Sequence, residues 1–334
     1  MQAITLKKPG GLGHLVLSDI EPVAPGPGEI QVDIKASSLN FHDYAVVSGM
    51  IPVDEGRIPM SDGAGVVAAV GDGVTEFAPG DRVLSCFFPN WHDGGPALSK
   101  LLGVPGDHIN GFAAQTVTLG ANAFTRMPAN LDFDAASTLT CAGLTAWRAL
   151  MVETQLRPGD WVLVQGSGGV SIFALQLAKM MGCNVIATSS SDEKLERLQK
   201  LGADHLINYR STPEWGNRVL ELTGGRGVDL VVEVGGSGTV PQSIRAVAFG
   251  GCISMIGVLT GMTGEVPTAE LFQKNAVISG ITVGSRAHQQ QLISAVETNG
   301  LEPVIDSRFA LTDLADAFRH QESQQHFGKI CVQI

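Results

Sequence analysis

Short apolar runs alternate with amphipathic helical segments through the second half of the chain. The run at 162–164 ends in a glycine-rich turn, and helical periodicity resumes from Ile172 to Met181. Such a short run, bounded by turn residues and helices, is typical of a strand buried on both faces of a parallel sheet. Further runs of this kind cover 184–188, 205–207, 228–234, 251–257 and 276–283. The pattern predicts a six-stranded, doubly wound parallel sheet in an α/β fold.

The first part of the chain has a different pattern. Alternating apolar and polar positions, as in 29–36 and 65–70, predict half-buried strands separated by turns rich in Pro and Gly. Residues 89–110 show no hydrophobic periodicity and predict a long loop. This loop could be a flap beside the substrate or an ordinary surface loop, and neither interpretation is favoured. A helical pattern over 132–152 joins this β-rich region to the first buried strand, and the tail after 284 is expected to return to it.

The glycine turn is the motif that carries most information. It follows a buried strand and opens a helix, so its backbone N–H groups and the positive helix end can hold a pyrophosphate. Ser171 replaces the third glycine of the Gly-x-Gly-x-x-Gly pattern, but the repeated strand–helix context favours dinucleotide binding over a plain turn. The candidate cofactor-binding residues of the turn are Gly166, Ser167, Gly168, Gly169 and Val170.

Composition removes several classes of partner. The formal net charge of -11 and the lack of basic runs disfavour nucleic acid. The sequence has no apolar stretch long enough to predict a membrane span, and it does not start with the charged and then apolar segment that predicts export. The five cysteines are scattered, without a Cys-x-x-Cys pair, which favours reduced thiols and a cytoplasmic location.

Several separate motifs converge on one family. They are Gly71-x-Gly73-Val74, the stretch 79–83, the block 141–147, the glycine turn and the stretch 200–209. Together they resemble the medium-chain dehydrogenase/reductase superfamily over essentially the whole chain, with the closest likeness to its zinc-independent quinone oxidoreductases and enoyl reductases. The resemblance implies a GroES-like catalytic domain at 1–142 plus 284–334 and a Rossmann dinucleotide-binding domain at 143–283, with the active site in the cleft between them.

The positions that hold catalytic zinc in the alcohol dehydrogenases of this superfamily are Asn40, Ser61 and Cys141 here. Amide and hydroxyl groups are poor ligands for zinc, which prefers thiolate and imidazole. We therefore expect no zinc or other metal, although His42 could in principle substitute as a ligand.

The nucleotide is predicted to be NADP(H). An acidic residue at the end of the second strand would accept from the 2′-hydroxyl of NAD, and Ser189 stands there instead. The family resemblance places Ser190, Lys194 and Tyr209 at a 2′-phosphate. Ser189–Ser191 could instead only cap the next helix, but capping can coexist with binding, so phosphate contact is favoured. Further expected cofactor contacts come from Gly235 and Gly257, at strand ends, and from Arg286, which could instead lie in solvent.

Hydride transfer without a Lewis acid favours conjugated acceptors, whose charge spreads into an enolate or phenolate. Asn40 is the first candidate for orienting substrate or ribose, and Asp43 and Thr145 are further catalytic candidates with equally open structural interpretations. Tyr44 and His42 are possible proton donors, although solvent would suffice for a quinone.

The sequence thus predicts an NADPH-dependent, zinc-independent oxidoreductase acting on a small quinone or α,β-unsaturated carbonyl. The alternatives are an NAD(P)-dependent alcohol dehydrogenase and an NADPH-binding redox sensor or structural protein with little turnover. The apolar run 276–283 would be an unprotected edge strand, and relatives pair this strand across a two-fold axis, so we expect a homodimer.

Overall fold

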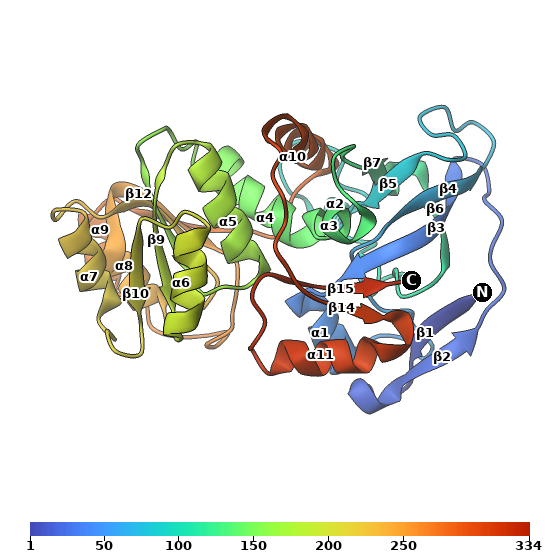
Figure 1. Cartoon of the computed structure of the whole chain (residues 1–334), viewed down its shortest axis with the longest axis horizontal. Helices are drawn as coiled ribbons and strands as arrows, with labels where there is room; N and C mark the ends of the chain where they lie inside the picture. Colours follow the sequence, from blue (N-terminus) through green and yellow to red (C-terminus); the bar gives the residue numbers. More distant parts are fainter. The chain divides into compact units, whose positions relative to one another are not determined.

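A computed structural model describes residues 1–334 as two compact units. The first unit comprises Met1–Leu144 and Gly284–Ile334, and the second comprises Thr145–Val283. Figure 1 shows the elements of both units, which are described one at a time below. None of the helices is both long enough and apolar enough to cross a bilayer.

The second unit is built on a parallel sheet of six strands in the order β10-β9-β8-β11-β12-β13. The order reverses beside β8, and this topological switch point is where nucleotides bind in such folds. Helices α5 and α6 lie on one face of the sheet and α7 to α9 on the other (Figure 1). The strands are β8 (Trp161–Gln165), β9 (Asn184–Ser189), β10 (His205–Asn208), β11 (Val228–Glu233), β12 (Val247–Met255) and β13 (Val277–Gly280). The helices are α5 (Gly169–Met180), α6 (Asp192–Lys200), α7 (Trp215–Leu222), α8 (Val240–Ala246) and α9 (Thr268–Gln273).

The first unit holds a seven-stranded sheet in the order β14-β15-β3-β4-β5-β7, with β6 paired to β3, and a separate β1-β2 hairpin. Its strands are β1 (Gln2–Leu6), β2 (Leu15–Asp19), β3 (Glu29–Ser38), β4 (Ala64–Val70), β5 (Arg82–Ser85), β6 (Thr116–Gly120), β7 (Phe124–Arg126), β14 (Ile305–Ala310) and β15 (Lys329–Gln333). Its helices are α1 (Phe41–Val47), α2 (Leu98–Leu101), α3 (Phe133–Ser137), α10 (Arg286–Asn299) and α11 (Leu314–Glu322). The predicted combination of a doubly wound sheet and a β-rich domain is confirmed.

The chain passes from the first unit to the second within α4 (Leu144–Trp147). Helix α4 is flanked by two π-helical turns, Leu139–Gly143 and Arg148–Glu153. π-Helical turns insert an extra residue into a helix and are frequent at functional sites. The helical segment predicted over 132–152 is therefore present, but two of its stretches are π-helical rather than α-helical.

Two sequence expectations need correction. The run 276–283 is not one long buried strand, because β13 has only four residues and Val277 is 57% exposed. Strand β13 pairs on one side only, with β12, and the positive φ of Val283 (42°) cannot continue a strand. The loop 89–110 contains α2 and the buried Trp91, whose indole N–H donates to the carbonyl of Gly94 at 2.8 Å.

Candidate functional site

The glycine turn of the second unit has the geometry of an anion-binding helix start. Gly166 has a φ of 72°, which favours glycine, and Gly168 caps α5 without any side-chain hydrogen bond to the first turn. The Ser171 hydroxyl donates to the carbonyl of Gln165 at 2.6 Å. Serine therefore fits at the third glycine position, because its hydroxyl closes the junction between strand and helix. The residues present can hold the pyrophosphate of a dinucleotide.

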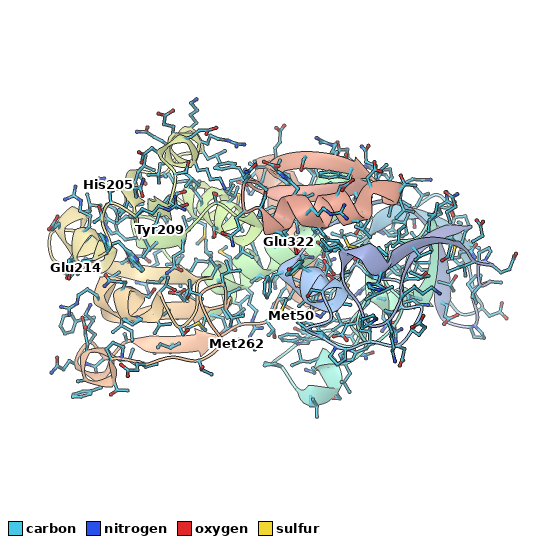
Figure 2. The ribbon with its side chains drawn as sticks, turned by 90° about the horizontal axis from the view of Figure 1, so that it is seen from below. Met50, His205, Tyr209, Glu214, Met262 and Glu322 are labelled. Atoms are coloured by element: carbon cyan, nitrogen blue, oxygen red, sulfur yellow. The ribbon has the colours of Figure 1, made fainter.

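The ends of β9 and β10 bring two predicted cofactor-binding residues, Ser189 and Tyr209, together. Asn208 pairs with Ser189 in the sheet, and the N–H of Tyr209 donates to the carbonyl of Ser189 at 3.1 Å. Tyr209, labelled in Figure 2, is 41% exposed. The Ser189 hydroxyl is buried and accepts from the N–H of Ser191 at 3.3 Å, so it faces inward rather than toward a ligand.

Ser191 also caps α6, because its hydroxyl accepts from the N–H of Lys194 at 3.4 Å. The capping role proposed for this serine run is thus present at Ser191. Ser190 and Lys194 are each half-buried beside the cap. Ser189 and Ser190 are the two serines predicted to contact the cofactor. Ser189 is buried at the sheet edge, whereas Ser190 is only half-buried.

A buried carboxylate that the sequence analysis did not identify organises the loop after β11. Glu233 is fully buried and accepts from the hydroxyls of Ser243 and Thr239 and from the side-chain amide of Gln165. It also accepts from the N–H groups of Gly235 and Gly236, at 2.8 and 3.0 Å. Glu233 therefore fixes the backbone at the carboxyl end of β11. A charged residue inside an apolar strand pattern is the signal that could have revealed it.

Gly235 and Gly257 are required for internal packing. A Cβ at Gly257 would lie 2.1 Å from the carbonyl oxygen of Val234, and one at Gly235 would lie 2.3 Å from the Thr239 hydroxyl. The strand ends do approach closely, as expected, but the close neighbours are the protein's own atoms.

In the first unit, Asn40 and Asp43 lie at the start of α1. Asn40 precedes the helix, and its side-chain Nδ2 donates to the Ser61 hydroxyl at 3.3 Å. Asp43 is buried, and its two oxygens accept from the N–H groups of Asn40 and Ser61 at 2.9 and 2.8 Å. Both carboxylate oxygens are thus used to tie two loops together. The structure thus gives Asp43 a role in holding these loops, and its catalytic role stays a prediction.

A second residue that the sequence analysis missed, Lys329, completes this cluster from β15. Its ammonium donates to the Asn40 side-chain oxygen at 2.6 Å and to the carbonyl of Leu39 at 2.5 Å, and it lies 3.5 Å from the Asp62 carboxylate. Asp62 also accepts from the Ser38 hydroxyl at 2.6 Å. Burial raises the pKa of Asp62 to about 6 despite the Lys329 charge. The available signal was a lysine at the start of an otherwise apolar strand.

The two possible proton donors are both bound to carboxylates. His42 Nε2 lies 3.2 Å from Asp107, and Tyr44 donates to Glu322, labelled in Figure 2, at 2.7 Å. Burial alone would lower the pKa of His42, but the Asp43 and Asp107 carboxylates outweigh burial and raise it.

Two other candidates are Arg286, whose contacts differ from the expected one, and Thr145, whose catalytic role stays a prediction. The Arg286 guanidinium donates to the carbonyl of Phe124 at 2.8 Å and pairs with Glu76, so its contacts are structural. The expected cofactor contact of Arg286 is therefore not supported. Thr145 is buried within α4, at the first position of the second unit.

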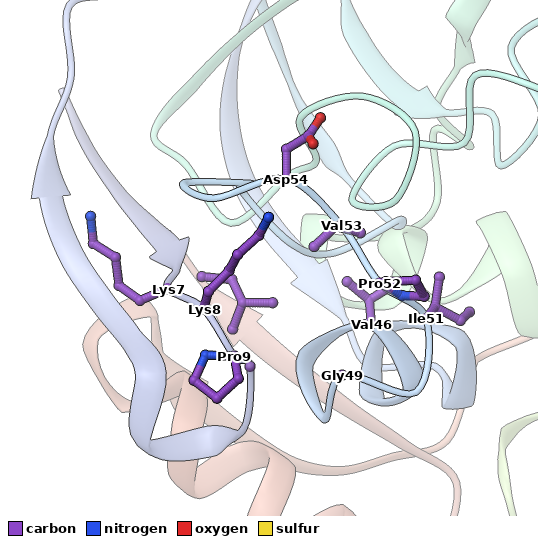
Figure 3. A pocket seen from close by; sticks show the side chains of 11 residues that line it. Lys7, Lys8, Pro9, Val46, Gly49, Ile51, Pro52, Val53 and Asp54 are labelled. Carbon is purple, nitrogen blue, oxygen red and sulfur yellow. The ribbon is translucent and has the colours of Figure 1, made fainter.

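A hollow at the other end of α1 is distinct from the Asn40 cluster. Figure 3 shows this cavity, of about 230 Å³, between the segment Leu6–Gly10 and the loop that follows Gly49. The loop after Gly49 contributes Ile51–Asp54 to it. Its charged groups, Lys7, Lys8 and Asp54, are all exposed, and it contains none of the predicted catalytic residues.

The residues at the expected zinc positions do not fit a zinc ion. The oxygen of Asn40 already accepts from an ammonium, Ser61 offers a hydroxyl, and Cys141 is the one soft ligand, half-buried on a π-helical turn. A dication beside the fixed charge of Lys329 would be repelled, and one thiolate cannot form a tetrahedral site.

Comparisons with known proteins agree with this architecture. Residues 26–129 match the alcohol dehydrogenase GroES-like domain family, and residues 169–298 match the zinc-binding dehydrogenase family. A zinc-type alcohol dehydrogenase-like protein of Schizosaccharomyces pombe is 42% identical over 94% of this chain and 93% of its own length.

Two solved structures extend the likeness over the whole chain. An NAD-dependent alcohol dehydrogenase is 35% identical, with a TM-score of 0.92 over 100% of both chains. A quinone oxidoreductase of Pseudomonas syringae is 30% identical, with a TM-score of 0.84 over 100% of this chain and 99% of its own. The shared sequence and the two-unit architecture show that the chain is an oxidoreductase of the medium-chain dehydrogenase/reductase superfamily.

Proposed function

We propose that this protein transfers hydride from NADPH to a small quinone or α,β-unsaturated carbonyl without the help of zinc. The observation that carries the proposal is the Asn40 cluster, in which an amide and a hydroxyl, Asn40 and Ser61, stand at two of the expected zinc positions and the amide oxygen already accepts from the Lys329 ammonium. The likeness to a quinone oxidoreductase supports the same substrate class, whereas the likeness to alcohol dehydrogenases makes alcohol oxidation the alternative.

NADPH would be held by the glycine turn, Gly166–Val170, by Ser190 and Tyr209 directly after β9 and β10, and by Lys194 in the first turn of α6. When bound, it supplies the hydride. No carboxylate ends β9 to repel a 2′-phosphate, since Ser189 stands there. The likeness to an NAD-dependent enzyme makes the choice of nucleotide a direct target for measurement.

In this proposal Asn40 donates a hydrogen bond to the substrate that accepts the hydride. An amide carries two N–H donors, and the Ser61 hydroxyl takes one of them. The other can donate to the carbonyl oxygen of the substrate, where negative charge develops as hydride adds to the conjugated system. For a quinone, solvent supplies the protons that complete the hydroquinone.

The decisive experiment is stopped-flow oxidation of NADPH and NADH against a panel of quinones, enones and, in the reverse direction, alcohols, with metal content measured on the same sample. We expect rapid NADPH oxidation by conjugated acceptors and no stoichiometric zinc. Alcohol oxidation by a zinc-loaded protein would contradict the proposal. Tight NADPH binding without turnover of any acceptor would favour a redox sensor.

Lys194→Ala tests the nucleotide assignment. Loss of a charged donor to phosphate should raise the Kd for NADPH about tenfold and leave the Kd for NADH unchanged. Lys200→Ala, on the last turn of the same helix, is the matched control and should change neither constant. An equal effect of Lys194→Ala on both nucleotides would remove the 2′-phosphate contact.

We also propose a homodimer formed through β13. The strand has a free edge, and exposed apolar side chains surround it, with Phe249, Phe272 and Val277 exposed by 76%, 69% and 57%. Sizing by light scattering should give twice the chain mass, and Val277→Lys should give a monomer. A wild-type monomer would exclude this assembly. A cytoplasmic location stays a prediction from the cysteine pattern.

A further inference from the structure

Lys329 is an unusual residue for its place in the fold. It begins β15, lies 289 residues from Asn40 in the sequence, and is only 3% exposed. Lysine is almost never buried to this extent unless its charge is paired. All three donors of the ammonium are directed at specific groups: the Leu39 carbonyl, the Asn40 side-chain oxygen and the Asp62 carboxylate.

The ammonium determines which way the Asn40 amide points. With its oxygen on Lys329, the amide nitrogen must lie on the opposite side, where it donates to Ser61. A flipped amide would place an N–H donor against the ammonium, so that two donors face each other and the ammonium loses one of its acceptors. The cost of that arrangement is high because Asn40 is 7% exposed and Ser61 is fully buried.

We propose that Lys329 is a positioning residue that acts through Asn40, holding the amide so that its remaining N–H is presented to the substrate oxygen. This inference rests on the proposed function, in which Asn40 donates to that oxygen. Asp62, itself held by Ser38, balances the ammonium charge and keeps Lys329 at the cluster. The oxygen-binding group is therefore built from β15 as well as from the start of α1.

A double-mutant cycle tests the coupling. Lys329→Met and Asp62→Asn are introduced together, because Lys329→Met alone would leave a buried unpaired carboxylate. The paired change should lower kcat for the best acceptor about 10- to 100-fold, as expected when a donor is misplaced rather than removed. The Kd for NADPH, measured by fluorescence, should not change.

Asn40→Ala should lower kcat at least as much, and the triple variant should be no slower than Asn40→Ala alone. A triple variant whose loss is the product of the two separate losses would overturn the inference, and so would a paired variant with wild-type kcat. Lys35→Met, at an exposed lysine on β3, is the control for lysine removal in the same sheet and should be silent.

A spectroscopic measurement separates this inference from the proposed function. In protein labelled with [¹⁵N]asparagine, the side-chain amide signal of Asn40 is identified by its loss in Asn40→Ala. The signal should shift in the Lys329/Asp62 paired variant but not in Lys35→Met. An unmoved signal would refute the role of Lys329 whatever the activity. A shifted signal in a protein that reduces no acceptor would refute only the proposed function.

Asn40→Asp provides a second test if the paired variant does not fold. Aspartate keeps an oxygen for Lys329 but has no N–H for substrate. The variant should therefore melt at a higher temperature than Asn40→Ala while losing kcat to a similar degree. Equal melting temperatures would show that the Lys329 contact contributes nothing at this position.

Discussion

Each unit of the protein buries a carboxylate beside residues proposed to bind nucleotide or substrate, and the two units satisfy these carboxylates differently. Asp62 in the first unit has a cation, Lys329, and one hydroxyl donor, Ser38. Glu233 in the second unit has five neutral donors from side chains and backbone. One of the Asp62 oxygens has no hydrogen-bond partner, whereas both Glu233 oxygens are fully used.

The different partners of Glu233 and Asp62 indicate two different structural roles for a buried carboxylate. A carboxylate held by many fixed donors acts as a scaffold, because removing it leaves several buried groups unsatisfied at once. A carboxylate paired with one lysine positions that lysine and can still exchange its proton in a useful pH range. The first arrangement suits a rigid nucleotide loop, and the second suits a cluster that must direct one amide.

The largest effect on this comparison is expected from Glu233→Gln. A glutamine offers one oxygen and places an N–H₂ group among donors, so the variant should lose about 3–4 kcal/mol of unfolding free energy. Urea unfolding followed by circular dichroism measures the loss, and the affinity for NADPH should fall with it. Glu221→Gln, on the surface of α7, is the control and should change stability by no more than about 0.5 kcal/mol. A Glu233→Gln protein as stable as this control would contradict the scaffold role.

The next effect concerns pH. The pKa of Asp62 is about 6 in the folded protein against 3.8 for an ordinary aspartate. Because the folded pKa is raised, the stabilisation from protonated Asp62 is fully present below pH 3.8 and is lost as the pH rises through 6.

The difference in unfolding free energy, wild type minus Asp62→Asn, should therefore decrease across this window by on the order of 3 kcal/mol. Taking the difference removes the contribution of His42 and other groups that titrate in both proteins. Urea titrations at several pH values provide the measurement. A flat difference would mean that the folded protein holds Asp62 with an ordinary pKa.

The smallest effect compares two serines. Ser243→Ala removes a donor from a carboxylate with no cation, and Ser38→Ala removes one from a carboxylate that keeps Lys329. We expect losses of about 2 and about 1 kcal/mol, respectively, because hydrogen bonds to charged groups contribute more when nothing else compensates the charge. Thermal unfolding of the two variants side by side decides the order. The reverse order would show that the Lys329 pair does not share the charge of Asp62.

The sequence predicts the parallel sheet of the second unit because each strand carries its own apolar run and its own turn. The glycine turn could be predicted because its motif is local, whereas Asn40 was identified as a candidate through the family resemblance, which places it at a zinc position. Lys329 and Glu233 could not be placed, since their importance depends on partners up to 289 residues away. The edge position of β13 was expected, but its length and burial were overestimated, because an apolar run does not show where a strand ends or which of its side chains are covered. The contacts of Arg286 could not be predicted either, because its partner Glu76 lies 210 residues before it in the sequence.

The connectivity of the first unit has a consequence for how the protein is made. Strand β15 lies between β14 and β3, and it comes from residues 284–334, after the whole second unit has been synthesised. The second unit is contiguous in the chain and can fold while it leaves the ribosome. Until then the end of β3 at 36–38, which pairs with β15, has no partner there, whereas β6 already pairs with residues 29–33, so the nascent chain is vulnerable to misassociation at this one stretch of strand edge.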